Sequence, residues 1–313
     1  MKKILIAILL VTNFCYSQEK IPFIDYTEII QKISKETENE KVVNLINQVN
    51  KNDSAYYSLL VSKSYYLLQS KKYKEALDVV NEGLNNPHSH SKANFYANKG
   101  VALSNLKRNQ EALDNYNKGL QFYPKNALLW FNKGYVLETQ GKLNEAVNAY
   151  KKAITFNPTY TKPHLQIGNI YYKQECLTQA LMCFNMFLLL EPDADGAFTV
   201  LQSLNNVIQA KNSNKRDSNL KLDDADDSFE DIDLALSSNI AMNANYKTNN
   251  PFNLALVRQN HAMIAQLKNF EGESNFWTKT YVPFYNWIAQ NNKFDDFIYT
   301  LCYSIKNEEY KKI

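Results

Sequence analysis

Along the middle of the chain, apolar and small side chains recur at helical spacing in segments separated by short polar turns. In one segment Trp130, Gly134 and Leu137 stand at i, i+4 and i+7, and this spacing places them on one face of an α-helix. In the next segment Ala146 and Tyr150 form the matching stripe. The pattern therefore predicts a helix, a turn and a second helix.

The same pattern returns at every thirty-fourth position, and we call this step the repeat period. Three residue types keep the period over three copies: Gly100, Gly134 and Gly168, then Ala112, Ala146 and Ala180, then Pro124, Pro158 and Pro192. A glycine inside a helix costs about 1 kcal/mol relative to alanine, so a recurrent glycine indicates a close approach of two helices. We expect Gly134 and Ala146 to provide it, and an aromatic ring at Trp130 or Tyr150 to fill the adjoining space.

These residues resemble the motif of the tetratricopeptide repeat (TPR) family. The resemblance rests on Trp130-x2-Lys133-Gly134-x2-Leu137, Ala146-x3-Tyr150 and Pro158, with their counterparts one repeat period before and after. Lys133 and Leu137 are mild departures, since they replace the usual leucine and tyrosine. The resemblance implies an all-α fold, a right-handed α-solenoid of helix-turn-helix hairpins. It also implies that the first helices of the hairpins line a concave, protein-binding groove.

The phased positions divide the chain into repeats and flanking segments. TPR units are predicted within 55–192, at about 55–88, 93–126, 127–160 and 161–194, after a signal peptide at 1–17 and a degenerate N-terminal repeat at 18–54. A capping helix at 197–210 is expected to cover the last apolar face. An acidic linker at 211–227 and a smaller helical C-terminal region at 228–313 follow.

The acidic stretch could be a solvated linker or a calcium loop. Eight of residues 217–233 are acidic, a composition typical of solvated segments. A calcium loop fails because Phe229 stands where the sharp turn requires glycine and Ala235 where the bidentate glutamate belongs. The linker interpretation is therefore favoured.

The C-terminal region is rich in aromatic residues, with ten between Phe276 and Tyr303. Tyr281, Tyr285 and Ile288 repeat the i, i+4, i+7 stripe, which predicts a further, diverged hairpin. Rings at helical spacing usually face the core. We expect most of them to be buried rather than to form a binding surface.

The N-terminus predicts export. Lys2 and Lys3 form a basic n-region, and Ile4 to Val11 form an apolar run too short to span a bilayer. Cleavage near Ser17 would release a periplasmic or extracellular protein with no integral membrane span in the mature chain. An uncleaved anchor is the alternative. A lipid anchor on Cys15 is disfavoured because no small residue precedes it.

Charge and cysteine content narrow the partners. The formal charge is +3 among 313 residues, and no basic stripe is visible in the sequence, so no nucleic-acid partner is predicted. Cys176, Cys183 and Cys302 remain after cleavage. An odd number leaves at least one free thiol or an intermolecular bond, and a buried free thiol is the simpler interpretation.

The sequence offers no catalytic constellation, and the protein is predicted not to be an enzyme and to need no cofactor. His88 and His90 share a loop, but two histidines without an acidic or cysteine neighbour indicate a metal site only weakly, so no metal is predicted. His164 occupies the packing slot equivalent to Trp130, and His261 stands alone. No phosphate loop, nucleophile elbow or cysteine–histidine arrangement is present.

The predicted groove supplies the candidate functional residues. They lie on the first helices, on the side opposite the packing stripe: Tyr65, Leu68, Asn94, Asn105, Phe131, Tyr135, Glu138, Lys162, Asn169, Tyr172 and Lys173. Exposed aromatic rings beside lysine and asparagine suit an extended peptide or a partner helix. The alternative is that these rings pack against a neighbouring repeat or against the C-terminal region.

The sequence therefore predicts a non-enzymatic scaffold or adaptor that binds another protein or peptide in the TPR groove. Chaperone-type recognition of a terminal carboxylate is doubtful, because only Asn169 matches the residues that the family uses for it. One rival is that the repeats deliver a C-terminal ligand-binding or enzymatic domain. Another is homo-oligomerisation through the aromatic C-terminal region.

Overall fold

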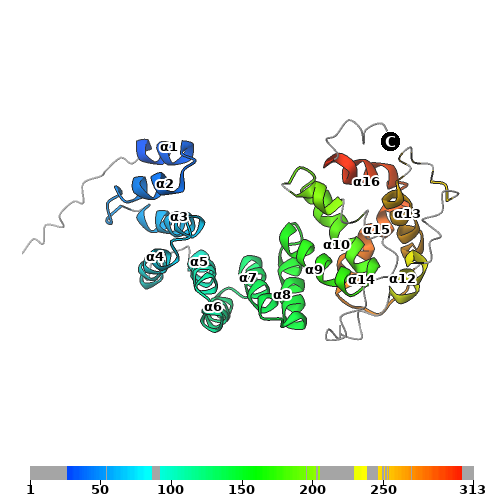
Figure 1. The fold of residues 1–313 in the computed structure, drawn as a ribbon, viewed down its shortest axis with the longest axis horizontal. Coiled ribbons are helices and arrows are strands. Elements are labelled where there is room, and N and C mark those ends of the chain that lie inside the picture. Colours follow the sequence, from blue (N-terminus) through cyan, green and yellow to red (C-terminus); the bar gives the residue numbers. More distant parts are fainter. Residues whose placement is uncertain are drawn as a thin grey trace, which may run out of the picture. The chain divides into compact units, whose positions relative to one another are not determined.

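The computed structural model is built from helices (Figure 1). It describes residues 27–304 apart from 54, 87–91, 195, 202–203, 205–228, 238–245, 249, 251, 253 and 269. Every regular element among these residues is helical, so the all-α prediction is confirmed. No helix in the described part of the chain combines the length and the apolar character needed to cross a membrane.

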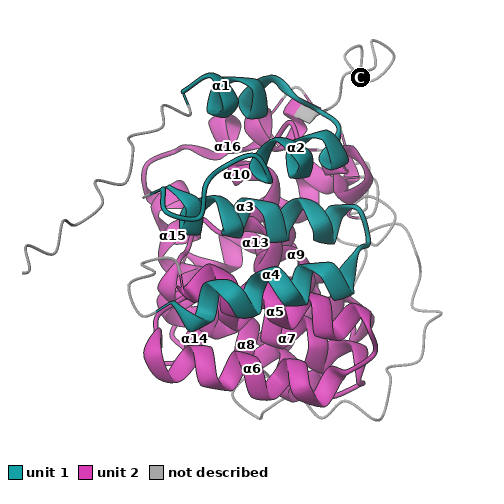
Figure 2. Ribbon diagram, turned by 90° about the vertical axis from the view of Figure 1, so that its left-hand side faces the viewer, with its two compact units in different colours: residues 1–91 teal, residues 92–313 magenta. Residues whose placement is uncertain are grey.

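The chain forms two compact units, residues 1–91 and 92–313 (Figure 2). The boundary falls inside the predicted repeat array, next to the His-Ser-His-Ser segment that interrupts the repeat period.

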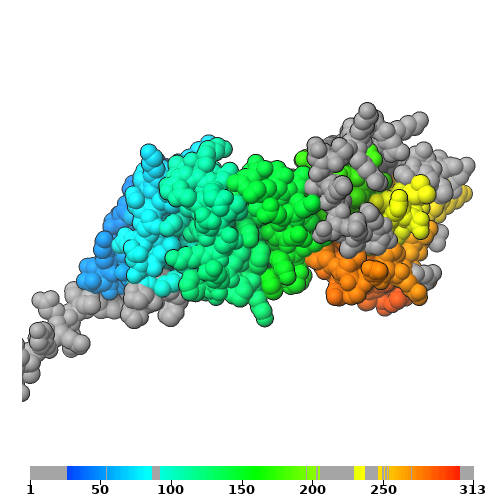
Figure 3. All heavy atoms as spheres, turned by 90° about the horizontal axis from the view of Figure 1, so that it is seen from below, coloured from blue at the N-terminus to red at the C-terminus, as the bar shows by residue number. Residues whose placement is uncertain are grey.

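Unit 2 begins with three helical hairpins. Their helices are α5 (Lys92–Asn105), α6 (Asn109–Phe122), α7 (Ala127–Thr139), α8 (Leu143–Phe156), α9 (Thr161–Lys173) and α10 (Leu177–Leu190). Each second helix also packs against the first helix of the following hairpin. The hairpins are thus stacked in chain order, the helical repeat arrangement that the sequence predicted, and their atoms form a continuous surface (Figure 3).

The turn inside each hairpin has one recurrent geometry. In the middle hairpin Gly141 has a φ of 73°, and the N–H of Lys142 donates to the carbonyl of Leu137 at 3.0 Å. Lys107 and Glu175 occupy the equivalent left-handed position with φ values of 64° and 61°. Glycine tolerates this conformation most readily, so the local bonding pattern, rather than glycine itself, is what the repeats share.

The predicted close approach of the two helices is confirmed. A Cβ atom on Gly134 would lie 2.6 Å from a ring carbon of Tyr150 and 3.2 Å from the carbonyl oxygen of Ala146. Gly168 faces the ring of Phe184 in the same way, at 2.9 Å. Tyr150 fills the space beside the glycine, whereas Trp130 is half-buried and its indole N–H donates to the carbonyl of Pro124 at 2.8 Å.

The chain continues with residues 197–201 and 204, which are helical and bury Ala197, Val200, Leu201 and Leu204. The remainder of the predicted capping helix, and the predicted linker at 211–227, lie outside the described residues. The C-terminal helices are α12 (Glu230–Ser237), α13 (Ala255–Leu267), α14 (Phe276–Thr280), α15 (Val282–Gln290) and α16 (Phe294–Leu301), followed by the 3-10 turn η2 (Cys302–Ser304).

The C-terminal helices pack around α10, and polar groups join them to it. The backbone N–H and the hydroxyl of Thr178 both donate to Asp233 Oδ1, at 2.7 and 2.5 Å. Buried Asn185 donates to Asn260 Oδ1 at 2.6 Å. Because Thr178, Asn185 and Asn260 are buried, separating the C-terminal helices from α10 would leave unsatisfied polar groups.

The aromatic residues of the C-terminal region divide between core and surface. Trp277, Tyr281, Tyr285 and Phe297 are buried, and Trp287, Tyr299 and Tyr303 are exposed. The remaining rings between Phe276 and Tyr303 are half-buried. The core expectation therefore holds for the stripe residues Tyr281 and Tyr285, and only in part for the others.

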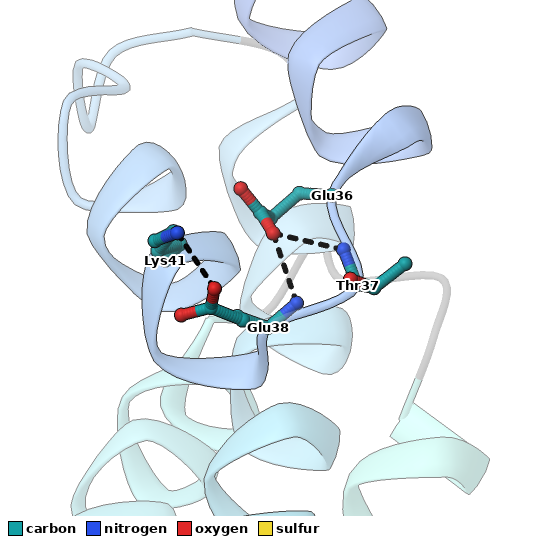
Figure 4. Close-up of polar contacts among 4 residues, drawn as sticks. All are labelled: Glu36, Thr37, Glu38 and Lys41. Carbon is teal, nitrogen blue, oxygen red and sulfur yellow. Dashed lines mark hydrogen bonds and ion pairs between the residues drawn. The ribbon is translucent and has the colours of Figure 1, made fainter.

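Unit 1 contains α1 (Thr27–Lys35), α2 (Asn39–Ile46), α3 (Tyr56–Gln69) and α4 (Tyr73–Asn85). The connection from α1 to α2 is tied by Glu36, whose carboxylate accepts the N–H groups of Thr37 and Glu38, both at 2.9 Å (Figure 4). The α3–α4 turn repeats the geometry of unit 2, because Lys72 N–H donates to the Leu67 carbonyl at 2.9 Å.

Candidate functional site

The candidate residues are distributed over both units. Tyr65 and Leu68 lie on α3 of unit 1, and the others lie on α5, α7 and α9 of unit 2. We define the first-helix face by the unit 2 residues whose side chains reach the surface: Asn94, Asn105, Tyr135, Glu138, Lys162, Asn169, Tyr172 and Lys173. Tyr65 is exposed on α3 of unit 1.

Two candidates are corrected by the structure. Phe131 is only 9% exposed, and its ring lies 5.6 Å from the ring of Tyr150 and 5.2 Å from that of Tyr160. Leu68 is buried within unit 1. Both side chains contribute to the core, as the packing alternative proposed, and neither is available to a partner.

Tyr135 and Glu138 form the centre of the first-helix face. Tyr135 is 50% exposed and Glu138 is half-buried. The hydroxyl of Tyr150 donates to Glu138 Oε2 at 2.6 Å. Burial, and then this hydrogen bond, raise the pKa of Tyr150 well above its usual value. Tyr150 therefore remains a protonated donor and fixes the Glu138 carboxylate beside an exposed ring.

The residues around this centre are polar. Lys162 and Lys173 are exposed at the two ends of α9, and Asn169 and Tyr172 lie half-buried between them. The side-chain amide of Asn105 is tied to its own helix, donating to the Val101 carbonyl at 2.9 Å. The face thus offers one carboxylate, two lysines and two tyrosine rings, groups that can bind a peptide but do not form a catalytic constellation.

His164 has the core position that its packing slot predicted. It is 1% exposed, its Nε2 lies 2.9 Å from the carbonyl of Pro158, and its Nδ1 lies 2.6 Å from the Tyr281 hydroxyl. Burial lowers the pKa of His164 to about 4, against the hydrogen bond to Pro158, which raises it. Neutral His164 therefore donates through Nε2 and accepts from Tyr281, and it acts as a structural link.

The other metal and thiol candidates give no site. His88 and His90 lie outside the described residues, and His261 is half-buried with its Nδ1 2.8 Å from the Tyr246 hydroxyl. Among the described residues no group of three potential ligands gathers for a metal. In the described part of the chain Cys176, Cys183 and Cys302 form no disulfide, and burial raises the pKa of Cys302 to about 11, which makes this thiol a poor nucleophile.

Sequence reasoning missed a cleft between α7, α8 and α14. We call it the α7–α14 cleft; it includes Trp130, Lys133, Lys152 and Lys279 and has a volume of about 680 Å³. Part of it was visible in the sequence, because Lys99 and Lys118 precede Lys133 and Lys152 by one repeat period. The contribution of α14 was not, because it depends on contacts far apart in the chain.

Comparisons with known families agree with the repeat geometry. A family described as tetratricopeptide repeat matches residues 93–126, the same bounds as the predicted unit. A second tetratricopeptide repeat family matches 115–148, and a family described as TPR repeat matches 139–175. The chain therefore contains tetratricopeptide repeats over residues 93–175.

Among solved structures the chain is similar to those of MamA. A structure described as the MamA RS-1 ArsTM double mutant is 19% identical with a TM-score of 0.42, over 54% of this chain and 96% of that one. MamA 41-end from Desulfovibrio magneticus RS-1 is 17% identical with a TM-score of 0.39, over 59% and 92%. No curated protein matches the chain.

Proposed function

We propose that this protein is a non-enzymatic scaffold that binds a segment of another protein along its first-helix face. Stacked helical repeats present extended surfaces for such binding. The observation that carries the proposal is the exposed Tyr135 ring beside a Glu138 carboxylate that Tyr150 holds in place. A rigid tyrosine next to a fixed charge offers both contact area and orientation at a low entropic cost.

The test is a pull-down from the organism's own extract with the mature chain. Tyr135→Ala combined with Tyr172→Ala should reduce recovery of the partner roughly fivefold or more, because both rings leave the face. Tyr303→Ala is the matched control, since Tyr303 is 61% exposed on η2 and lies outside the face. Equal recovery with the double variant and the control would refute this assignment.

The delivery alternative is less well supported. The C-terminal helices share one compact unit with the repeats, and they are joined to α10 through buried polar pairs such as Asn185 with Asn260. A cargo domain would need fewer buried contacts with its carrier. Truncation at residue 211 would expose the buried face of α10, so it would test folding rather than delivery.

We also propose that the protein is exported to the periplasm or the cell exterior. The support is the sequence of the segment 1–17, with Lys2 and Lys3 before the apolar run Ile4 to Val11. This segment lies outside the described part of the chain. The intact mass of the protein isolated from its own cells should correspond to a chain beginning at Gln18. A retained Met1 would contradict the proposal.

A further inference from the structure

The α7–α14 cleft lies on a different side of the repeats from the first-helix face. The α7–α8 hairpin forms one wall with Trp130, Lys133 and Lys152, and α14 forms the other with Phe276 and Lys279. The green repeat surface adjoins the orange C-terminal segment in Figure 3. The volume of the cleft, about 680 Å³, falls within the range of roughly 300–1,000 Å³ that is usual for ligand sites.

The cleft carries an excess of positive charge. Lys133, Lys151, Lys152 and Lys279 line it together with a single acidic residue, Glu145. Lys133, Lys152 and Lys279 form no ion pair with another described residue. Burial lowers the pKa of half-buried Lys133, so its charge is held at a cost that an incoming carboxylate would offset.

Aromatic rings give the cleft a fixed shape. Lys151 Nζ lies 5.8, 5.6 and 5.5 Å from the ring centroids of Tyr171, Phe276 and Trp277. The cation–π contacts with Phe276 and Trp277 join α8 to α14, and the contact with Tyr171 joins α8 to α9. On the opposite wall Lys133 Nζ lies 5.3 Å from the Trp130 ring, so lysines already lie over rings on both walls.

The positions of these lysines distinguish between two possible anionic partners, single-stranded nucleic acid and acidic polypeptide. Single-stranded nucleic acid would need free ring faces on which its bases could stack. Lys133 already lies over Trp130, and Lys151 over Phe276, so stacking there would displace a lysine. Carboxylates need only reach the ammonium groups, while an apolar side chain contacts the ring edges. The arrangement favours acidic polypeptide.

We propose that the α7–α14 cleft binds an acidic segment of a partner protein, whose carboxylates pair with Lys133, Lys152 and Lys279. This is a second site, beyond the interaction assigned to the first-helix face. The preceding repeat extends it, because Lys99 and Lys118 stand at the positions equivalent to Lys133 and Lys152. A segment longer than the cleft therefore meets a second basic cluster along the same side of the array.

Fluorescence anisotropy with a defined probe tests the proposal. The probe is a fluorescein-labelled peptide of alternating Asp and Glu with one central Phe, and the control probe has Asn and Gln in their place. Lys152→Glu combined with Lys279→Glu should weaken binding of the acidic probe roughly tenfold or more. Lys125→Glu combined with Lys247→Glu makes the same charge change at exposed residues that do not line the cleft and should leave the affinity unchanged.

Each further outcome either supports or overturns the assignment. Equal loss in both double variants would show long-range attraction rather than a site and would overturn it. So would displacement of the probe by a single-stranded oligonucleotide of the same charge at equal concentration. Unchanged thermal unfolding of the variants by circular dichroism establishes that they fold. Tyr135→Ala with Tyr172→Ala should bind the probe normally, which separates this test from that of the first-helix face.

Discussion

The hairpins α7–α8 and α15–α16 have the same turn but pack in opposite ways. In the first, Lys142 N–H donates to the Leu137 carbonyl at 3.0 Å, and in the second, Lys293 N–H donates to the Ile288 carbonyl at 2.9 Å. A left-handed residue precedes each of these donors: Gly141 with a φ of 73° and Asn292 with a φ of 53°. Asparagine is among the residues that tolerate this conformation, so the chain makes both turns from local sequence.

The two hairpins differ at the residue that lies eight positions before each turn donor, Lys142 or Lys293. That position is Gly134 in the repeat and Tyr285 in the C-terminal hairpin. Gly134 lets Tyr150 of the same hairpin approach closely. Tyr285 is fully buried and its hydroxyl donates to the Met182 carbonyl of α10 at 3.0 Å. A small residue at this position thus lets the two helices of a hairpin approach closely, whereas the large residue of the C-terminal hairpin packs onto α10 of the preceding repeat.

Removing the large residue should have the largest effect. We expect Tyr285→Ala to lower the free energy of unfolding by about 4 kcal/mol, because it leaves a cavity against α10 and an unpaired carbonyl at Met182. Urea unfolding followed by circular dichroism measures this change. Tyr303→Ala, at a 61% exposed tyrosine, is the control and should be close to neutral. A similar loss in both would contradict the comparison.

Acid should weaken the junction between the repeats and the C-terminal region. His164 has a pKa of about 4 in the fold and 6.5 when unfolded, so the unfolded chain takes up the proton first. The contribution of His164 to the free energy of unfolding is therefore fully present above about pH 6.5. It decreases by about 3 kcal/mol as the pH falls toward 4. Urea unfolding across this pH range should show that the wild type loses about 3 kcal/mol more stability than His164→Phe does. Equal pH profiles would refute it.

The smallest effects are expected at the two glycines of the α7–α8 hairpin. Gly134→Ala should cost about 2 kcal/mol despite the better helix propensity of alanine, because its Cβ would meet the buried Tyr150 ring at 2.6 Å. Gly141→Ala, with nothing within 4 Å but a φ of 73°, should cost about 1 kcal/mol from backbone strain alone. Thermal unfolding distinguishes them. If Gly141→Ala were the more damaging change, packing would not be the reason for Gly134.

The repeats were predictable because their determinants are local. The period of Gly134 and Ala146 and the helical spacing of the apolar residues predicted the hairpins, and a family match has the predicted bounds 93–126. Phe131 shows the limit of this reasoning. Its offset on α7 predicted a surface position, but the ring of Tyr160, from the turn before the next repeat, packs against it. Helical offset alone does not reveal such a neighbour.

The sequence by itself determined the helix pairs, their turns and the places where they approach, because these depend on residues within one repeat period. Only the tertiary structure decided that Tyr281 meets His164 across 117 positions, and that Lys151 joins α8 to α14. Contacts over such separations leave no period in the sequence. They depend on which apolar face no further repeat covers. In this protein that face belongs to α10, and the C-terminal helices pack against it.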